Sequence, residues 1–357
     1  MTRKISFIIY FITSISFAQD YIEYATGSTT DATTNHSFGI CLMGGSSESD
    51  EAMKWFLNKT DGGDIVVLRA SGSDGYNDYM YSELGVTINS VTTFVINNVN
   101  GAIDSYVLDK VAKAEGIWFA GGDQFNYVSY FKDNAMEDAL NTFINTKQGV
   151  IGGTSAGMAI LGNYYFDAAN GSVTSDQALV NPYTARVSLG YDDFLKVPFL
   201  ESTVTDTHYD ARSRRGRHSV FLARFANDNG MRSFGIASNE RTAVCVDADG
   251  KASVFGSYPS HESYAYFLQA NCTSEFDPET CESGTPLTWN RSNEAIKVYK
   301  VTGKTTGENY FDLTDWNTGF GGTWENWYID NGAFFNTGTT NPNCLLSLGE
   351  LYNVSKK

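Results

Sequence analysis

The sequence predicts an α/β fold with a mostly parallel sheet flanked by helices and a β-rich C-terminal extension. Two features of the sequence predict this architecture. Short, continuously apolar segments alternate with amphipathic segments between residues 38 and 162, as in buried parallel strands that are connected by helices. Glycine-rich turns follow several apolar segments, at the carboxyl edge where open α/β sheets place their functional sites.

The expected elements follow one another in a regular order. Apolar strands cover residues 38–45 (FGICLMGG), 64–70 (DIVVLRA), 92–98 (TTFVINN), 117–122 (IWFAGG) and 149–153 (GVIGG). Segments with helical spacing cover residues 48–59, 104–116, 134–147 and 156–162. Beyond residue 235, the segment TAVCVDADGKASVFG predicts two strands joined by an Asp-Gly turn. We expect one catalytic domain over residues 19–284 and a β-rich extension over residues 285–357 that packs on it.

The N-terminus has the features of a secretory signal peptide. Arg3 and Lys4 precede an apolar run that ends at Phe17, and Ser16 and Ala18 are small residues in cleavage-site positions. The run is too short for a comfortable membrane span. We expect residues 1–18 to be removed, which leaves a secreted chain, or a periplasmic one if the source is Gram-negative.

The charge balance excludes one class of partner. The chain carries 25 Lys and Arg residues against 41 Asp and Glu residues, a net charge of −16. Nucleic-acid binding requires a basic face, so we expect no nucleic-acid partner. No motif indicates a metal or another cofactor, and no later segment is long and apolar enough to hold the chain in a membrane.

The five cysteines suit an exported protein with few disulfides. Cys272 and Cys281 flank a short acidic loop and are placed to close it as a disulfide. Cys41 and Cys245 lie inside apolar segments, so we expect buried thiols there.

The segment GGTSAGM contains the strongest candidate for a nucleophile. Ser155 lies in a G-x-S-x-G pattern between an apolar strand and a helix, which is the context of a nucleophile elbow. Flanking glycines permit a strained turn, and the following helix turns its free N–H groups toward developing negative charge. The alternative is a glycine-rich turn without a chemical role.

A serine nucleophile needs a base, and the chain has four histidines: His36, His208, His218 and His261. His208 is the best candidate because it follows a β-branched run and opens a polar cluster, DTHYDARSRRGR. Asp206 stands two residues earlier and would point the same way on a strand.

Four arginines follow His208 closely: Arg212, Arg214, Arg215 and Arg217. They form either a solvated helix face paired with acids or a clamp for substrate carboxylates, which guanidinium groups bind through two parallel hydrogen bonds. Upstream, the GGDQ turn after residue 120 offers backbone N–H groups for an oxyanion hole, and Gln124 is placed to contact substrate.

Together, FAGGDQ, GGTSAGM and DTHYDARSRRGR resemble the cyanophycinase branch of the serine peptidases, which includes dipeptidase E. The late segment GIASNERTAVCVDADGKASVFG is also similar, and the resemblance covers roughly residues 38–260. It implies a class I glutamine-amidotransferase-like, flavodoxin-like fold. It also implies hydrolysis of cyanophycin, a polyaspartate with arginine on each β-carboxyl group, to β-aspartyl-arginine dipeptides.

The resemblance implies a role for each matching residue. Ser155 would be the nucleophile and His208 the base, with an orienting acid at Asp176 or, failing that, Asp167. Backbone N–H groups of Ala156 and Gly122 would bind the oxyanion. The residues implied to contact substrate are Gln124, Asp206, Arg212, Arg214 and Arg217. Thr207 replaces the longer glutamine that the family usually has before the histidine.

Two other functions compete with this interpretation. An α/β-hydrolase esterase shares the order serine, acid, histidine, but about fifty residues between Ser155 and His208 leave little room for that fold's strands. A secreted binding protein would present the aromatic rings of the C-terminal segment, Trp289, Trp316, Trp324 and Trp327, to a polymer. On the peptidase interpretation the partner is a peptide or polypeptide substrate, and a homodimer is left open.

Overall fold

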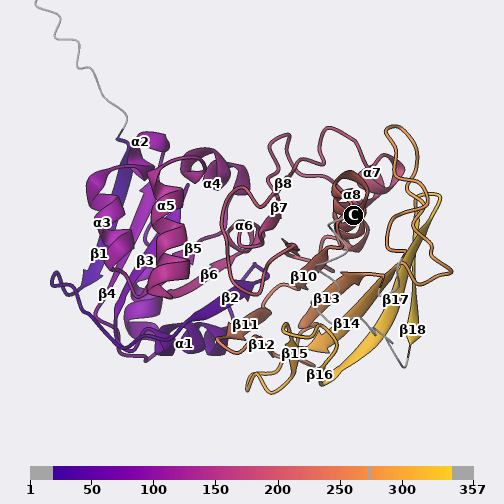
Figure 1. Cartoon of the computed structure of the whole chain (residues 1–357). Coiled ribbons are helices and arrows are strands. Elements are labelled where there is room, and N and C mark those ends of the chain that lie inside the picture. Colours follow the sequence, from indigo (N-terminus) through magenta and orange to yellow (C-terminus); the bar gives the residue numbers. More distant parts are fainter. Residues whose placement is uncertain (1–18, 272–274, 340–357) are drawn as a thin grey trace, which may run out of the picture.

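Two β-sheets and the helices around them make up the part of the chain that the computed structural model describes, residues 19–271 and 275–339 (Figure 1). The expected signal peptide, residues 1–18, lies outside these residues. Cys272 does too, so its expected disulfide with Cys281 has no structural description. None of the described helices is long and apolar enough to cross a membrane.

The first sheet has ten strands and a parallel centre. Its order is β1-β4-β3-β5-β6-β2-β11-β12-β15-β16, and the neighbours from β4 to β2 run parallel. The strands are β1 (Tyr21–Gly27), β2 (Gly39–Met43), β3 (Asp64–Arg69), β4 (Ser90–Ile96), β5 (Gly116–Phe119), β6 (Val150–Thr154), β11 (Ala243–Asp247), β12 (Lys251–Phe255), β15 (Tyr310–Asp312) and β16 (Gly319–Phe320).

The second sheet has eight strands and is mainly antiparallel. Its order is β18-β17-β14-β13-β10-β9-β7-β8, with parallel pairing only between β7, β9 and β10. The strands are β7 (Tyr164–Phe166), β8 (Leu189–Tyr191), β9 (Thr203–Asp206), β10 (Phe234–Ser238), β13 (Tyr264–Ala270), β14 (Ile296–Thr302), β17 (Gly322–Asp330) and β18 (Ala333–Thr339).

The helices agree with the expected order, with two differences at their ends. They are α1 (Asp50–Lys59), α2 (Val99–Ala102), α3 (Ser105–Lys113), α4 (Gln124–Phe131), α5 (Ala135–Thr142), α6 (Ala156–Ala159), α7 (Ser175–Val180) and α8 (Arg215–Asn229), with π-helical turns η1 (Tyr79–Glu83) and η2 (Phe143–Lys147). The helix expected over 134–147 is α5 continued by η2. The helix expected over 156–162 is the single turn α6.

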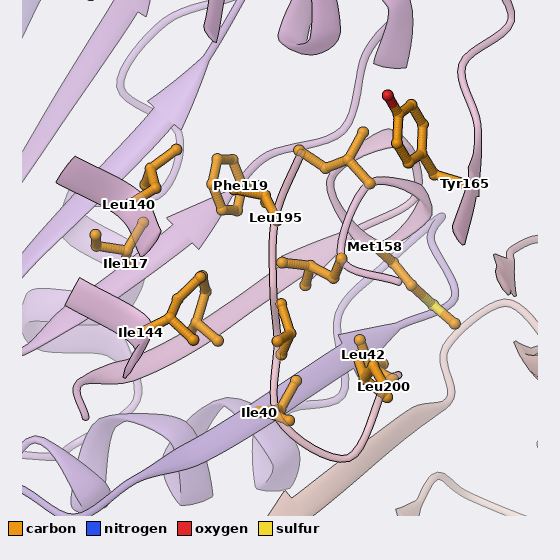
Figure 2. Packing of buried hydrophobic residues seen from close by; sticks show 14 of the residues in the cluster. Ile40, Leu42, Ile117, Phe119, Leu140, Ile144, Met158, Tyr165, Leu195 and Leu200 are labelled. Atoms are coloured by element: carbon orange, nitrogen blue, oxygen red, sulfur yellow. The ribbon is translucent and has the colours of Figure 1, made fainter. Parts of the chain in front are cut away.

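Alternate residues of each central strand enter different cores. Leu42 and Phe119 pack under helices α3, α4 and α5, whereas their neighbours Cys41 and Trp118 pack against α1. Figure 2 shows the first of these cores, in which Met158 of α6 lies beside Leu42 and Leu200. Helices on both faces explain why these strands are apolar on both sides.

The same core joins the two sheets. Phe234 and Phe267 of the second sheet share a buried cluster with Leu42 of the first, and the opposite face of the second sheet packs against α7 and α8. The expected α/β class with helix-flanked sheets is confirmed, but the sheets are mixed rather than mostly parallel. The short hairpin connections after residue 235 produce antiparallel pairs, and these build mixed sheets instead.

The residues beyond 285 extend both sheets, with β15 and β16 in the first sheet and β14, β17 and β18 in the second. Strand β14 pairs with β13 and β17, which continue the second sheet into the yellow strands at the right of Figure 1. Trp289, Trp316 and Trp327 are fully buried there, and the partly buried Trp324 packs against the core. These rings are part of the core, so they do not form the exposed aromatic surface of a polymer-binding protein.

Candidate active site

The candidate site lies where the carboxyl ends of five strands meet. In the first sheet, β2, β5 and β6 run parallel and end at this edge. In the second sheet, β9 and β10 also run parallel and end there. Loops after adjacent parallel strands converge in this way at the functional edge of open α/β sheets.

Ser155 occupies a sharp turn at the end of β6. Its φ of 52° and ψ of −114° lie outside the conformations that non-glycine residues usually adopt. A Cβ on Gly157 would come within 2.1 Å of the Phe119 carbonyl oxygen, so only glycine permits α6 to approach β5 this closely. This strained strand-to-helix turn is the geometry of a nucleophile elbow.

Three side chains form a continuous hydrogen-bonded chain at this edge. Ser155 Oγ lies 2.8 Å from His208 Nε2, and His208 Nδ1 lies 2.7 Å from Glu240 Oε1. A carboxylate oxygen only accepts, so Nδ1 carries the proton and Nε2 is left to accept from the Ser155 hydroxyl. This tautomer is the one that a general base requires.

Glu240, rather than the expected Asp176 or Asp167, is the carboxylate that hydrogen-bonds His208. It follows β10, which is parallel to β9 and therefore ends beside His208. Asp176 lies exposed in the first turn of α7, and Asp167 accepts a hydrogen bond from the backbone N–H of Ala169. Neither aspartate makes a hydrogen bond to His208 in the described part of the chain.

Burial keeps His208 in the form that accepts a proton. Removal from water lowers the pKa of His208 below its ordinary value, and the positive charges of Arg212 and Arg214 lower it further. The hydrogen bond to Glu240 opposes these effects. The imidazole therefore stays neutral at neutral pH, ready to take the proton of Ser155.

The Gly44–Gly45 turn after β2 holds the site together through its backbone. The N–H of Ser155 donates to Met43 O (3.0 Å), that of His208 to Gly44 O (2.8 Å) and that of Arg241 to Gly45 O (3.1 Å). Gly45 has a φ of +102°, and a Cβ there would lie 2.5 Å from His208 Nε2. The glycine pair thus fixes the spacing of the two sheets at the reacting atoms.

Asp206 and Arg217 do not reach the site as substrate contacts. Both are almost fully buried and form a bidentate salt bridge. Asp206 Oδ2 lies 2.8 Å from Arg217 Nε, and Asp206 Oδ1 lies 2.6 Å from Arg217 Nη2. Arg217 Nη1 donates to Ser172 and Val173. Burial alone would raise the pKa of Asp206, but Arg217 and Arg214 lower it to about 2. The expectation that these two residues contact substrate is corrected, because their side chains are buried and bind each other.

Replacing Arg217 with methionine is expected to lower the free energy of unfolding by about 3–5 kcal/mol, because Asp206 would be left buried without its main partner. Denaturant unfolding followed by circular dichroism measures this. Arg212→Met, at an exposed position, is the matched control and should change stability by less than about 0.5 kcal/mol. Equal unfolding midpoints for Arg217→Met and the native chain would contradict the structural role.

The other residues expected to contact substrate are Arg212, Arg214 and Gln124, and they differ in how far they are buried. Arg212 is exposed, and its charge acts on His208. Arg214 Nη1 donates to Thr207 and Asp206, which places this arginine partly inside the ion network. Gln124 Nε2 donates to Phe166 O at 3.4 Å, which orients its amide from the start of α4.

The expected oxyanion donors border the nucleophile. A Cβ on Gly121 would lie 3.6 Å from Ser155 Cβ, so the GGDQ turn passes directly beside the serine. Gly122 is exposed next to it, and Ala156 follows Ser155 at the start of α6. Because α6 is a single turn, only its first N–H groups, and not the dipole of a longer helix, are available to stabilise negative charge at Ser155.

Two cavities share Arg241, the residue that follows Glu240. One of about 440 Å³ has Glu48, Arg241, Ser257 and His261 among its lining residues. The other, of about 370 Å³, is lined by Asp210, Ala211, Asn239, Glu240, Arg241, His261 and Glu262. Glu240, which hydrogen-bonds His208, is part of the wall of the second cavity.

The remaining histidines are engaged elsewhere. His218 is buried, its Nδ1 lies 3.1 Å from the Tyr209 hydroxyl, and burial lowers its pKa to about 4. His36 Nε2 contacts Lys147 O, and His261 Nε2 contacts Arg241. In residues 19–271 and 275–339, no group of three or more His, Cys, Asp or Glu side chains is arranged to hold a metal ion.

Glu240 and the Gly44–Gly45 turn were the parts of the site that sequence reasoning missed. Both had a detectable signal, because each directly follows a fully buried strand, as Ser155 and His208 do. The search for the acid stayed near α6 in sequence, whereas the fold supplies it from the neighbouring parallel strand.

Two solved peptidase structures were compared with the chain. A peptidase from an acI-B1 Actinobacterium has a TM-score of 0.48 and 12% identity, and the match covers 77% of this chain and 97% of that one. A putative peptidase E protein from Listeria monocytogenes EGD-e has a TM-score of 0.38 and 12% identity, over 62% and 99% of the two chains.

Sequence comparison finds distant relatives of one kind. A cyanophycinase from Synechococcus elongatus is 22% identical over 236 residues, which cover 64% of this chain and 68% of that protein. A cyanophycinase from Trichormus variabilis is 24% identical over 152 residues, 43% of this chain and 46% of that protein. No protein-family model matches the chain. These relatives show that the chain is distantly related in sequence to cyanophycinases.

Proposed function

We propose that this chain is an exported serine peptidase that hydrolyses cyanophycin or related aspartyl peptides. Ser155 acts as nucleophile, His208 as general base and Glu240 as the acid that orients His208. The observation that carries the proposal is the continuous chain from Ser155 Oγ through His208 to Glu240, with separations of 2.8 and 2.7 Å. Its serine lies on the strained turn at the end of β6.

The proposed reaction proceeds through an acyl-enzyme. His208 Nε2 takes the Ser155 proton while Oγ attacks the aspartyl carbonyl carbon, and N–H groups of Gly122 and Ala156 bind the oxyanion. His208 then gives that proton to the leaving amine as the C–N bond breaks. Water, deprotonated by His208, attacks the ester and releases the aspartyl product and free Ser155.

The nature of the relatives and the charge of the site support an aspartyl-arginyl substrate. The sequence relatives are cyanophycinases, and Asp210, Glu240 and Glu262 line the second cavity. These carboxylates suit the guanidinium groups of such a substrate, and Arg212 remains exposed beside His208 for a substrate carboxylate. The helix-covered parallel centre of the first sheet supports our assignment of a class I glutamine-amidotransferase-like fold.

Incubation with defined substrates tests this function. The chain from residue 19 onward should release β-aspartyl-arginine from purified cyanophycin, or cleave α-aspartyl or isoaspartyl peptides in a matched panel. Mass spectrometry of the products identifies the bond. Absence of cleavage throughout the panel by a folded protein would contradict the proposed function, and so would full cleavage by the Ser155→Ala control.

A further inference from the structure

Arg241 occupies a distinctive place beside the triad. It directly follows Glu240, and its backbone has a φ of +57°, held by the hydrogen bond from its N–H to Gly45 O. A non-glycine residue in this conformation is uncommon and indicates a position fixed by its surroundings. The turn that positions His208 therefore also positions Arg241.

The side chain of Arg241 stands between the two cavities next to the site. It lines both of them, and His261 does the same. Arg241 Nη1 lies 2.5 Å from His261 Nε2, while His261 Nδ1 lies 2.7 Å from Ser260 O. Since a carbonyl only accepts, Nδ1 carries the proton and Nε2 accepts from Arg241. His261 thus orients the guanidinium without neutralising its charge.

The acids around the first cavity are already occupied. Glu48 accepts from the hydroxyls of Tyr76 and Thr154, Asp50 accepts from Tyr79, and Glu51 pairs with Lys54. Among the described residues that line either cavity, Arg241 is the only Lys or Arg. Within the described part of the chain, the side chain of Arg241 bonds to the neutral His261 and forms no ion pair with a carboxylate of these walls.

We propose that Arg241, oriented by His261, binds a carboxylate group of the substrate in the first cavity. A guanidinium group presents several N–H donors in a plane and suits a carboxylate better than any other side chain does. Hydroxyl groups of Ser47, Ser257 and Thr305 line the same cavity and supply further donors. The three carboxylates of the first cavity each accept a hydrogen bond from a neighbouring side chain, and its hydroxyls stand beside Arg241, so we place the substrate carboxylate in this cavity.

This inference rests on the proposed function, and it deepens it by naming a group that the substrate must carry. The carboxylate belongs either to a free C-terminus or to an acidic side chain near the cleaved bond. Both present the same chemistry to Arg241. Matched substrates distinguish the two sources.

The test compares four aspartyl dipeptides: Asp-Ala with a free C-terminus, Asp-Ala amide, Asp-Glu amide and Asp-Gln amide. KM is measured for the native chain, and Kd is measured by calorimetry for the Ser155→Ala chain, which binds without turnover. The native chain should prefer a carboxylate-bearing member over its neutral partner by roughly 10-fold or more. Preference within the first pair identifies the C-terminus, and preference within the second identifies the side chain.

Arg241→Met should abolish this preference while cleavage of the neutral peptides continues. Arg241→Lys should retain a part of it, because the charge remains but the planar pair of donors is lost. Arg291→Met is the matched control, since Arg291 pairs with Glu275 in the C-terminal part and lines neither cavity. An unchanged preference in Arg241→Met would overturn the inference and leave the peptidase function standing. If none of the four dipeptides is cleaved, the Kd values still decide the role of Arg241, and the cleavage of cyanophycin and isoaspartyl peptides separately decides the peptidase function.

Discussion

Replacing Ser155 with alanine is expected to lower kcat by about 10⁶-fold on whichever aspartyl substrate the native chain cleaves. Removal of the nucleophile eliminates the acyl-enzyme route, and mutations of residues that act as one catalytic unit have effects of this size. Ser155 Oγ is the only atom that changes. The backbone N–H of Ser155 still donates to Met43 O, so the turn after β6 should persist.

Substrate binding distinguishes this chemical effect from a loss of structure. Ser155→Ala should unfold at the native midpoint and bind substrate with a Kd within a few-fold of the native KM. Single-turnover kinetics measure the residual rate. A rate reduced by less than about 100-fold would show that another group performs the attack, since positioning and oxyanion binding alone leave only a small remainder of the catalysis.

Replacing Glu240 with glutamine is expected to lower kcat by roughly 10³- to 10⁴-fold. Glu240 does not touch the reacting atoms, so it acts as a positioning residue that fixes the tautomer of His208. A glutamine amide can turn its N–H₂ group toward Nδ1, which then accepts and leaves the proton on Nε2. His208 in that tautomer cannot take the proton of Ser155.

The pH dependence of kcat/KM distinguishes a positioning role of Glu240 from a purely structural one, because a purely structural role would leave it unchanged. The neutral form of His208 is active, so kcat/KM of the native chain should fall as the pH drops through a pKa below the ordinary value of about 6.5. Burial lowers this pKa and the hydrogen bond to Glu240 raises it. Loss of the negative charge in Glu240→Gln should therefore move the acid limb to still lower pH.

Two aspartates near α6 in sequence serve as controls for Glu240. Asp176→Asn and Asp167→Asn remove the acids that sequence reasoning favoured, and neither residue contacts His208 in the described structure. Both variants should retain kcat within about two-fold. A large loss in Asp176→Asn together with a native rate in Glu240→Gln would reverse the assignment of the orienting acid.

The parallel centre of the first sheet was predictable because its strands are apolar on both faces. Such strands need helices on both sides, and the segments between them had helical spacing. Strand β1 carried no such signal. It is an edge strand of alternating half-buried and exposed residues, antiparallel to β4, and only its partner fixes its place.

Ser155 and His208 were predictable as separate candidates, whereas their acid was not. Each follows an apolar strand and stands among polar residues, which is a local property of the sequence. The link from His208 to Glu240 depends on β9 and β10 being neighbours. Strand order within a sheet is a long-range property of the fold. Only that order shows that the polar residues Asn239 and Glu240, which follow β10, lie near His208.

The arginine cluster shows a different limit. A guanidinium group that binds a substrate carboxylate and one that binds an internal carboxylate have the same chemistry, so spacing alone left both interpretations open. Burial decides between them, because Arg217 and Asp206 are 3% and 2% exposed and satisfy each other. Arg212, only five residues earlier, is exposed beside His208 and remains a candidate for substrate binding.

Labelling with a fluorophosphonate tests the central claim most directly. The reagent reacts with a serine oxygen that a neighbouring base has activated, forming an Oγ–P bond as fluoride leaves. We predict that the native chain is labelled at one site, that peptide mapping places the label on Ser155, and that labelling disappears in Ser155→Ala and slows strongly in Glu240→Gln. A folded native chain that remains unlabelled, or a label on any residue other than Ser155, would contradict a Ser155–His208–Glu240 triad.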